Sequence, residues 1–506
     1  MTAVRPATPL LLGIDLGTTA IKAGLFDLAG RSLGQARTGY PTDRPSRGRV
    51  EQDPAAWWRS IETVVGEVAR LAGTAEVAAI GICSQVNTHV LVDSEGEPLL
   101  PAIVWQDQRG VRVAAEIDGA IDERARDRIW GSPTHVDGSS PLARIAWCSR
   151  ERPEVLDKTR WVLSPKDFCN TRLTGEVASD PATAIGLVDA AGSYLPGVLA
   201  LVPGASDLLP PLRPMASVLG QARLALGPVQ PGAPVVVGTM DAWGSRYGSG
   251  VVASGQGMEV AGTSEILGLL SDRPGGAEGV VTFPPIDGRW FHAGPTQAGG
   301  DALRWWASLH GAGVEDVLAE AGHAPPGADG LVFLPHLMGE RAPVWDAALR
   351  GAFVGLSADH GRAHLARAVL EGVACSARHL LEALEEAAGR PCAALRASGG
   401  GAESDLWCQM KADLLGRPLE RMAVPSSGVL GAAILAGIGA GLLEDLDAAA
   451  DRLTVVERRF EPDPAAHERY RDLYQCYRAL QHDLGPTYRA LARFRDGAPP
   501  DRVAGE

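Results

Sequence analysis

A carboxylate follows an apolar run near the middle of the chain. Residues 234–237 are typical of a buried strand, and Gly238-Thr239-Met240 then leads to Asp241. Because α/β sites gather polar groups at the ends of strands, Asp241 could accept the proton of a substrate hydroxyl that attacks a phosphoryl group. It could equally be the N-cap of a helix over residues 242–248, a role that asparagine or serine would fill as well. The residues alone leave both interpretations open.

Two short turns could bind phosphate. Residues 10–27 are typical of two strands around Gly17-Thr18-Thr19, and residues 258–270 repeat the pattern around Gly262-Thr263-Ser264. Backbone N–H groups and hydroxyls in such a turn form a concave surface that suits phosphate oxygens. Asp15 could hold Mg²⁺ through water, since Mg²⁺ keeps waters and takes few carboxylates. The alternative is a pair of ordinary hairpins, with Asp15 capping the first turn.

The spacing of the two turns bears on domain organisation. They lie 245 residues apart in a chain of 506 residues. A single hydrophobic core stops growing at roughly 250–300 residues, so two domains are expected. The repeat suggests that the domains are related and that each opens with a strand–Gly-Thr–strand element. We place them at residues 1–245 and 246–506.

A third glycine-rich segment could contact a nucleotide. Ser398-Gly-Gly-Gly-Ala402 follows an apolar strand at residues 395–397 and precedes a helical stretch from Glu403. Glycines let a backbone lie flat against a bulky ligand, and the helix N-terminus adds partial positive charge. The segment matches neither a Walker motif nor G-x-G-x-x-G with its distant acidic residue. A tight turn with no ligand is as good an explanation.

Polar side chains follow two further strand candidates, at residues 77–83 and 102–105. Amides and carboxylates can hold sugar hydroxyls while an aromatic face covers C–H groups, and this cluster supplies all three. The alternative is a set of surface loops with Trp105 in the core. The residues are Gln85, Asn87 and His89 after the first strand, and Trp105, Gln106, Asp107 and Arg109 after the second.

The remaining pattern indicates an α/β fold. Apolar residues recur at helical spacing over residues 55–71, 365–384 and 462–484, and these stretches alternate with the strand candidates. The formal net charge is −14, which argues against nucleic acid or an anionic membrane as a partner. No apolar run approaches the ~20 residues of a membrane span, and residues 1–9 do not resemble a signal peptide. Seven scattered cysteines without C-x-x-C fit a reducing cytoplasm and inert core thiols.

In their order along the chain, these motifs resemble the FGGY carbohydrate kinases, and the resemblance covers nearly the whole sequence. The matching segments are Gly13–Thr19 (G-I-D-L-G-T-T), Glu51–Trp58 (E-Q-D-P-A-A-W-W), Trp105–Arg109 (W-Q-D-Q-R), Pro165–Asp167 with Arg172–Gly175 (P-K-D and R-L-T-G), Leu334–Pro343 (L-P-H-L-M-G-E-R-A-P) with Trp345-Asp346 and Arg350-Gly351, and Ser398–Ala402 with Trp407–Pro418.

The resemblance implies a two-domain actin/hexokinase-like (ribonuclease H-like) ATPase fold with a cleft between the lobes. It implies ATP and Mg²⁺ as cofactors, a small sugar or polyol as substrate, Asp241 as the base and Asp15 as the Mg²⁺-linked carboxylate. Dimers are frequent among such kinases, so a homodimer is compatible with it. The implied nucleotide-binding residues are Gly17, Thr18, Thr19, Gly262, Thr263, Gly300, Arg304, Gly400, Gly401, Ala402 and Asp405; the implied substrate-binding residues are Gln85, Val86, Asn87, Trp105, Asp107 and Asp241.

The chain departs from the family pattern in its sugar loops. Gln85-Val-Asn-Thr88 stands where xylulokinases usually show Q-M-H-G and glycerol kinases Q-R-E-T, while Ala242 after Asp241 is similar to ribulokinases. We expect a ketopentose, most simply of the xylulose type, with ribulose, erythritol, glycerol and gluconate as alternatives. A non-catalytic actin-like ATP-binding protein is a further alternative; a hexokinase or glucokinase fits these loops poorly. Ser427-Gly428 replaces a frequent Glu-Ala pair, and the sequence offers no physical reason.

Overall fold

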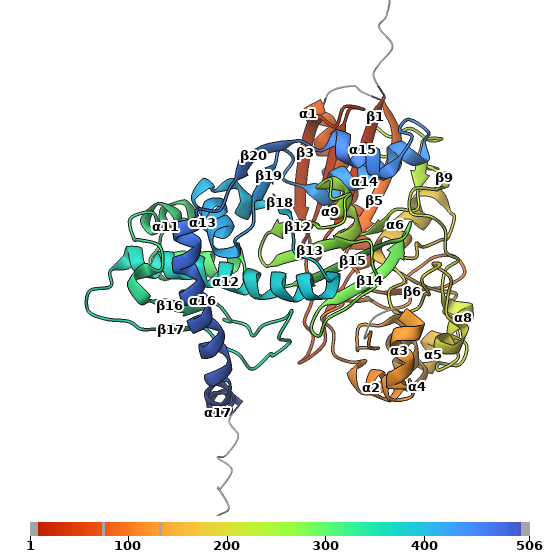
Figure 1. Cartoon of the computed structure of the whole chain (residues 1–506). Helices are drawn as coiled ribbons and strands as arrows, with labels where there is room; N and C mark the ends of the chain where they lie inside the picture. Colours follow the sequence, from red (N-terminus) through yellow and green to blue (C-terminus); the bar gives the residue numbers. More distant parts are fainter. Residues whose placement is uncertain (1–8, 73–75, 131–133, 497–506) are drawn as a thin grey trace, which may run out of the picture.

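The chain folds around two mixed β-sheets, one from each half of the sequence (Figure 1). The computed structural model describes residues 9–72, 76–130 and 134–496. No helix within these ranges is long and apolar enough to cross a membrane.

The first sheet has the strand order β3-β2-β1-β5-β10-β9, and β11 also pairs with β5. β1 pairs antiparallel with β2 and parallel with β5, so the predicted hairpin is central to the sheet. The strands are β1 (Leu10–Leu16), β2 (Ala20–Phe26), β3 (Ser32–Gly39), β5 (Val77–Ser84), β9 (Val218–Gln221), β10 (Pro234–Val236) and β11 (Thr239–Met240).

The second sheet repeats the arrangement around the second hairpin, in the order β14-β15-β13-β12-β18-β19-β20. β12 pairs antiparallel with β13 and parallel with β18, as β1 does with β2 and β5. The topology therefore contains the repeat that the two Gly-Thr turns predict. The strands are β12 (Gln256–Ala261), β13 (Glu265–Ser271), β14 (Val281–Ile286), β15 (Arg289–Pro295), β18 (Ala394–Ser398), β19 (Leu419–Met422) and β20 (Val456–Phe460).

The long helices lie close to their predicted positions. α1 (Pro54–Ala72), α12 (Arg362–Ala388) and α16 (Pro464–Asp483) correspond to the three predicted helical stretches, and α12 extends further at both ends. The helix expected from Glu403 is instead a 3₁₀ turn, η2 (Gly400–Glu403), followed by α13 (Asp405–Leu415), because Ser404 caps the N-terminus of α13.

Smaller elements surround the sheets. In the first half these are β4 (Glu51–Gln52), β6 (Val90–Val92), β7 (Ala102–Ile103), β8 (Trp161–Leu163), α2 (Val111–Gly119), α3 (Glu123–Trp130), α4 (Pro141–Glu151), α5 (Pro153–Leu156), α6 (Pro165–Thr174), α7 (Pro196–Leu199), α8 (Ala205–Leu208) and α9 (Asp241–Gly248). In the second half they are α10 (Gly300–Leu309), α11 (Val314–Ala321), η1 (Ala328–Gly330), β16 (Val332–Leu334), β17 (Ala352–Val354), α14 (Ser427–Gly439), α15 (Leu446–Leu453) and α17 (Gly485–Asp496).

Helix α14 belongs to the second half but packs on the first sheet, beside α9 (Figure 1). Its sequence, Ser-Gly-Val-Leu-Gly-Ala-Ala-Ile-Leu-Ala-Gly-Ile-Gly, is small and apolar on every side, which is typical of a helix with no solvent face. Residues 427–437 are all buried. The division after residue 245 falls inside α9 and stays a prediction, while α14 ties the two halves together.

Glycines allow this close approach. Gly13 on β1 and Gly81 on β5 are register partners, and a Cβ atom at these positions would lie 1.9 Å and 2.0 Å from carbonyl oxygens of α14. A Cβ at Gly248 of α9 would lie 1.8 Å from the Ser427 carbonyl oxygen, and one at Gly431 of α14 would lie 1.8 Å from the Gly244 carbonyl oxygen. No side chain larger than hydrogen fits at these contacts.

We expect Gly431→Ala to lower the free energy of unfolding by about 3 kcal/mol, since backbone atoms must separate to admit the methyl group. Urea unfolding would measure it. The matched control is Gly66→Ala in α1, where a new Cβ meets nothing within 4 Å, so the better helix propensity of alanine should leave stability unchanged or slightly higher. Equal effects of the two variants would contradict the packing argument.

Candidate active site

Asp15 and Asp241 arrive at the same edge of the first sheet. β1 and β11 both pair in parallel with β5, and both Asp15 and Thr239 have Cys83 as register partner. Asp241 follows β11 directly and is the first residue of α9. The N-cap position is Met240, and the Asp241 carboxylate accepts a hydrogen bond from the N–H of Ala242 at 2.8 Å. The N-cap interpretation of Asp241 is therefore wrong.

Burial changes the acidity of both carboxyls. Burial, and then the negative charge of Asp15, raise the pKa of Asp241 to about 7. Burial also raises the pKa of Asp15, although the charge of Lys22 and a hydrogen bond from Cys83 oppose this effect. A carboxyl that titrates near neutral pH is suited to act as a general base.

The first turn of α14 lies against Asp15. The Cys83 thiol contacts Asp15 Oδ1 at 3.7 Å and the Gly428 carbonyl oxygen at 3.3 Å. A Cβ at Gly428 would lie 3.0 Å from Asp15 Oδ2, so glycine leaves the carboxylate its space. Ser427 hydrogen-bonds Ser398 at 3.0 Å. These contacts give the Ser427-Gly428 pair a physical reason that the sequence did not supply.

Cys83 is buried as expected of a core thiol, but its neighbours include a carboxylate rather than apolar groups alone. Burial and the charges of Asp15 and Asp241 raise the pKa of Cys83 well above its usual range. The thiol is therefore held in its protonated form and serves as a hydrogen-bond donor.

The first Gly-Thr turn is fixed from three sides. The Tyr40 hydroxyl donates to the Gly17 carbonyl oxygen, and Gln52 Nε2 donates to that of Thr18 at 2.8 Å. The indole N–H of Trp105 donates to Thr18 Oγ1 at 3.1 Å. The turn and the predicted sugar loop are thus directly bonded to each other.

Both the oxygen and the nitrogen of the Gln52 side-chain amide form hydrogen bonds in this network. Its Oε1 accepts from Trp57 Nε1 at 3.2 Å and from Gln85 Nε2 at 2.9 Å, while its Nε2 donates to Thr18 and to Thr42 Oγ1 at 2.8 Å. The sequence singled out the E-Q-D-P-A-A-W-W segment only as a family match. The structure shows that its glutamine joins the first turn to Gln85.

The N-terminus of α10 is hydrogen-bonded to the second Gly-Thr turn. The N–H of Gly300 donates to the Gly262 carbonyl oxygen at 3.0 Å, and the N–H of Asp301 donates to that of Thr263 at 3.0 Å. A Cβ at Gly300 would lie 2.6 Å from the Gly262 carbonyl oxygen, which explains the glycine. Gly262 and Thr263 are exposed, as a ligand-contacting turn requires.

A buried ion-pair triad joins the two strands that flank this turn. Lys411 Nζ lies 2.5 Å from Glu259 Oε1 on β12 and 2.5 Å from Glu265 Oε1 on β13. Burial raises the pKa of Glu265 to about 7. The lysine thereby clamps the two strands that flank the second turn, a role that no sequence pattern indicated.

The glycine-rich segment packs beside the second turn. Gly399 has φ +84° and a Cβ there would lie 2.4 Å from the Ala261 carbonyl oxygen; one at Gly401 would lie 2.6 Å from Ala261 Cβ. Gly400 faces open space, since a Cβ there meets nothing within 4 Å. The structure therefore brings Gly262, Thr263, Gly300 and residues 400–402 together around one surface.

Two predicted nucleotide residues are engaged in ion pairs. Arg304 pairs with Asp301 at 2.6 Å, and Asp405 pairs with Arg421 at 2.7 Å and also with Arg458. Both side chains remain about half exposed. Their placement near the glycine-rich surface agrees with the expected region, and their roles stay predictions.

Most of the side chains in the loop that follows β5 are bonded to or packed against other parts of the protein. Gln85 is buried and bonded to Gln52 and Thr88, and Val86 packs against the apolar core beneath. Asn87 has φ +55° and donates through Nδ2 to Ser139 Oγ at 3.0 Å. Asn87 also lines a cavity, described below.

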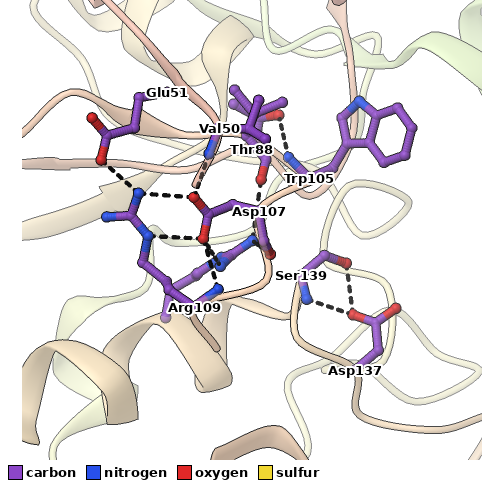
Figure 2. A network of polar contacts seen from close by, with 10 residues as sticks. Val50, Glu51, Thr88, Trp105, Asp107, Arg109, Asp137 and Ser139 are labelled. Atoms are coloured by element: carbon purple, nitrogen blue, oxygen red, sulfur yellow. Dashed lines mark hydrogen bonds and ion pairs between the residues drawn. The ribbon is translucent and has the colours of Figure 1, made fainter. Parts of the chain in front are cut away.

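Figure 2 shows that Asp107 is the centre of a charged network. Its carboxylate accepts from the N–H of Val50 at 2.7 Å and from Arg109 Nε and NH2 at 2.8 Å each. Arg144 approaches at 3.3 Å, and both side chains are 0% exposed. Because the carboxylate is saturated, we expect Asp107 to hold the loop that carries Trp105 rather than to contact a substrate. No sequence pattern indicated this role of Arg144.

A cavity of about 660 Å³ opens beside Asn87. Its walls come from both halves of the chain: Asn87, Thr134–Asp137, Ser140, Ile185 and Gly186 from the first, and Ala277–Thr282 and Trp345 from the second. The lining includes the carboxylates of Asp137 and Glu278 but no lysine or arginine among the described residues.

Comparison with known proteins decides the family. Models of the N-terminal and C-terminal domains of the FGGY family of carbohydrate kinases match residues 10–248 and 257–440. The chain belongs to the FGGY family. The protein is therefore a carbohydrate kinase, a phosphotransferase, and the expected family and enzyme class are confirmed.

Full-length relatives carry more than one substrate name. The chain is 29% identical to a gluconokinase of Bacillus subtilis (strain 168), over 97% of this chain and 99% of the relative. It is 28% identical to a xylulose kinase of Lactococcus lactis subsp. lactis (strain IL1403), over 96% and 99%. The crystal structure of a xylulose kinase from Rhodospirillum rubrum superposes with a TM-score of 0.83 at 31% identity, over 95% and 100%. The two-lobed α/β fold expected of the kinase is confirmed.

We expect Asp107→Asn to lower the free energy of unfolding by about 3–5 kcal/mol, since it leaves Arg144 buried without its anionic partner. The control is Asp53→Asn, which removes an ion pair with Arg59 whose side chains are 51% and 64% exposed. An exposed pair contributes about 1 kcal/mol or less. Urea unfolding of both variants would measure the difference, and similar losses would show that the Asp107 network is not tightly coupled.

Proposed function

We propose that this kinase transfers the γ-phosphoryl group of ATP to a hydroxyl of a ketopentose, most simply of the xylulose type, in carbohydrate catabolism. The observation that carries the proposal is the pair of half-buried carboxylates, Asp15 and Asp241, at the shared end of β1 and β11. Asp241 would take the proton of the attacking hydroxyl as the oxygen–phosphorus bond forms, and positioning would supply most of the rate.

The nucleotide would lie against the two Gly-Thr turns and the glycine-rich surface. Gly17, Thr18 and Thr19 would hold phosphate oxygens from one lobe, and Gly262 and Thr263 from the other. Gly300, Arg304, Gly400, Gly401, Ala402 and Asp405 would contact the rest of the nucleotide. The fixed first turn and the exposed second turn support this assignment.

The donor set fits Mg²⁺. Asp15 and Asp241 are hard oxygen donors whose pKa values burial raises, and neither forms an ion pair with a lysine or arginine within the described residues. Asp15 would hold Mg²⁺ through water, and the ion would neutralise phosphate charge when bound. Asp15 and Asp241 themselves supply negative charge at one place in the site.

The cavity beside Asn87 favours a neutral acceptor. Two carboxylates and no lysine or arginine in its described lining would repel an anionic sugar acid. Gluconate remains the second candidate, because a relative of similar length and 29% identity is named gluconokinase. Gln85, Val86, Asn87 and Trp105 would surround the acceptor. We also place the kinase in the cytoplasm; the homodimer stays a prediction, which light scattering would test.

An ADP-release assay with MgATP would test the function. The panel is D-xylulose, D- and L-ribulose, erythritol, glycerol and gluconate. We expect a strong response to one ketopentose, and Asp241→Ala should lose turnover by at least about a thousandfold while ATP still binds by calorimetry. Slow ATP hydrolysis that no acceptor stimulates would favour a non-catalytic ATP-binding protein, and near-normal activity of the variant would exclude Asp241 as the base.

The pH dependence follows from the raised pKa of Asp241, about 7. The base must be unprotonated, so kcat/KM for the acceptor should rise with pH and level off above about 8. Below about pH 6 it should fall roughly tenfold for each pH unit. A pH-rate profile would measure this. A flat profile between pH 5 and 8 would mean that no carboxyl with a raised pKa limits the reaction.

A further inference from the structure

The cavity of about 660 Å³ is lined by Asn87, which belongs to the same strand-end region as the two carboxylates. Asp241 follows Met240, whose register partner is Ser84 at the end of β5, and Asn87 comes three residues after Ser84 in the loop that follows this strand. The left-handed backbone of Asn87 turns the chain there. An acceptor whose reacting hydroxyl lies at Asp241 would therefore extend its far end past Asn87 toward the cavity.

The wall from the first half offers a fixed carboxylate. Asn87 Nδ2 donates to Ser139 Oγ at 3.0 Å, and Ser139 donates to Asp137 Oδ1 through its N–H at 2.7 Å and its hydroxyl at 2.6 Å. Figure 2 shows the Ser139–Asp137 pair beside the Asp107 network. Since both bonds reach Oδ1, the other oxygen of Asp137 can accept a ligand hydroxyl, a charge-assisted bond.

The wall from the second half offers a fixed aromatic surface. Trp345 lines the cavity, and 53% of its surface is exposed. Its indole N–H donates to the Gly279 carbonyl oxygen at 2.8 Å, and its backbone has φ +50°. With its N–H engaged, what Trp345 offers a ligand is ring surface, which suits C–H groups of a carbohydrate chain.

We propose that this cavity is a distal acceptor subsite, in which Asp137 binds the hydroxyls farthest from the phosphorylated one and Trp345 covers the adjoining C–H groups. The inference rests on the proposed kinase reaction and deepens it. Its ligand is neutral and polyhydroxylated, because the acidic Asp137 and Glu278 would repel an anion. We place its length at five or six carbons, so that it extends from Asp241 past Asn87. Both residues select the acceptor without touching the reacting atoms.

The subsite is tested by asking whether the effect of a substitution depends on the length of the acceptor's carbon chain. Trp345→Ala and Asp137→Asn should each raise the dissociation constant and KM of five- and six-carbon neutral acceptors by about tenfold. Glycerol and erythritol, which are too short to reach the cavity, should change less than about twofold. Trp345→Phe keeps a ring and should lie between the unmodified kinase and Trp345→Ala. Equal losses for short and long acceptors, or no loss at all, would overturn the proposal.

Two matched controls separate binding from loop structure. Met338→Ala changes a side chain that is 77% exposed in the same loop as Trp345 but does not line the cavity. Asp93→Asn changes a carboxylate that accepts from the N–H groups of Glu95 and Glu97, much as Asp137 does from Ser139. Both controls should keep the affinity for long acceptors, and a tenfold loss in either would contradict the assignment.

Calorimetry without nucleotide distinguishes the two proposals. If no acceptor is phosphorylated but ketopentose binding still weakens in Trp345→Ala and Asp137→Asn, the proposed reaction fails and the subsite stands. If phosphorylation occurs and the variants bind every acceptor like the unmodified kinase, the subsite fails and the reaction stands. Preferred binding of gluconate that Asp137→Asn strengthens would overturn the neutral ligand class.

Discussion

The close packing of α14 on β1, β5 and α9 is the constraint on which the other features depend. Backbone meets backbone at Gly13, Gly81, Gly248 and Gly431, so these elements approach each other more closely than side chains would allow. The helix comes from the second half of the chain, and its first turn lies against Asp15. One contact therefore joins the lobes and sets the space around Asp15, the carboxylate that we propose to be linked to Mg²⁺.

The charge arrangement at this place differs from that of the protein interior. Two half-buried carboxylates, Asp15 and Asp241, lie near each other without an ion-pair partner in the described chain, whereas most buried charges are paired, such as Lys411 with Glu259 and Glu265. Paired charges offset part of their desolvation and fix the strands. Asp241 has no lysine or arginine partner among the described residues, and burial and the charge of Asp15 raise its pKa to about 7. The protein thus stabilises its framework with ion pairs, whereas the two carboxylates of the candidate site have no cationic partner among the described residues.

The acceptor side is built on connected hydrogen bonds. Gln52 joins the first Gly-Thr turn to Gln85, Trp105 bonds the same turn, and Asp107 holds the loop that carries Trp105. A displacement of the loop that carries Trp105 would therefore shift the first Gly-Thr turn, which we propose binds phosphate. Asn87 lines the cavity and hydrogen-bonds Ser139 instead of joining this framework.

The sequence by itself determined the α/β class, the paired hairpins, the long helices and the family, because apolar periodicity and glycine-threonine turns are local signals. It also indicated Asp15 and Asp241, since each follows or interrupts a recognisable strand. Only the tertiary structure decided that Asp107 is saturated, that Arg144 and Gln52 support the site, and why Gly428 is a glycine. Those roles depend on contacts between residues tens to hundreds of positions apart, and no spacing along the chain encodes such contacts.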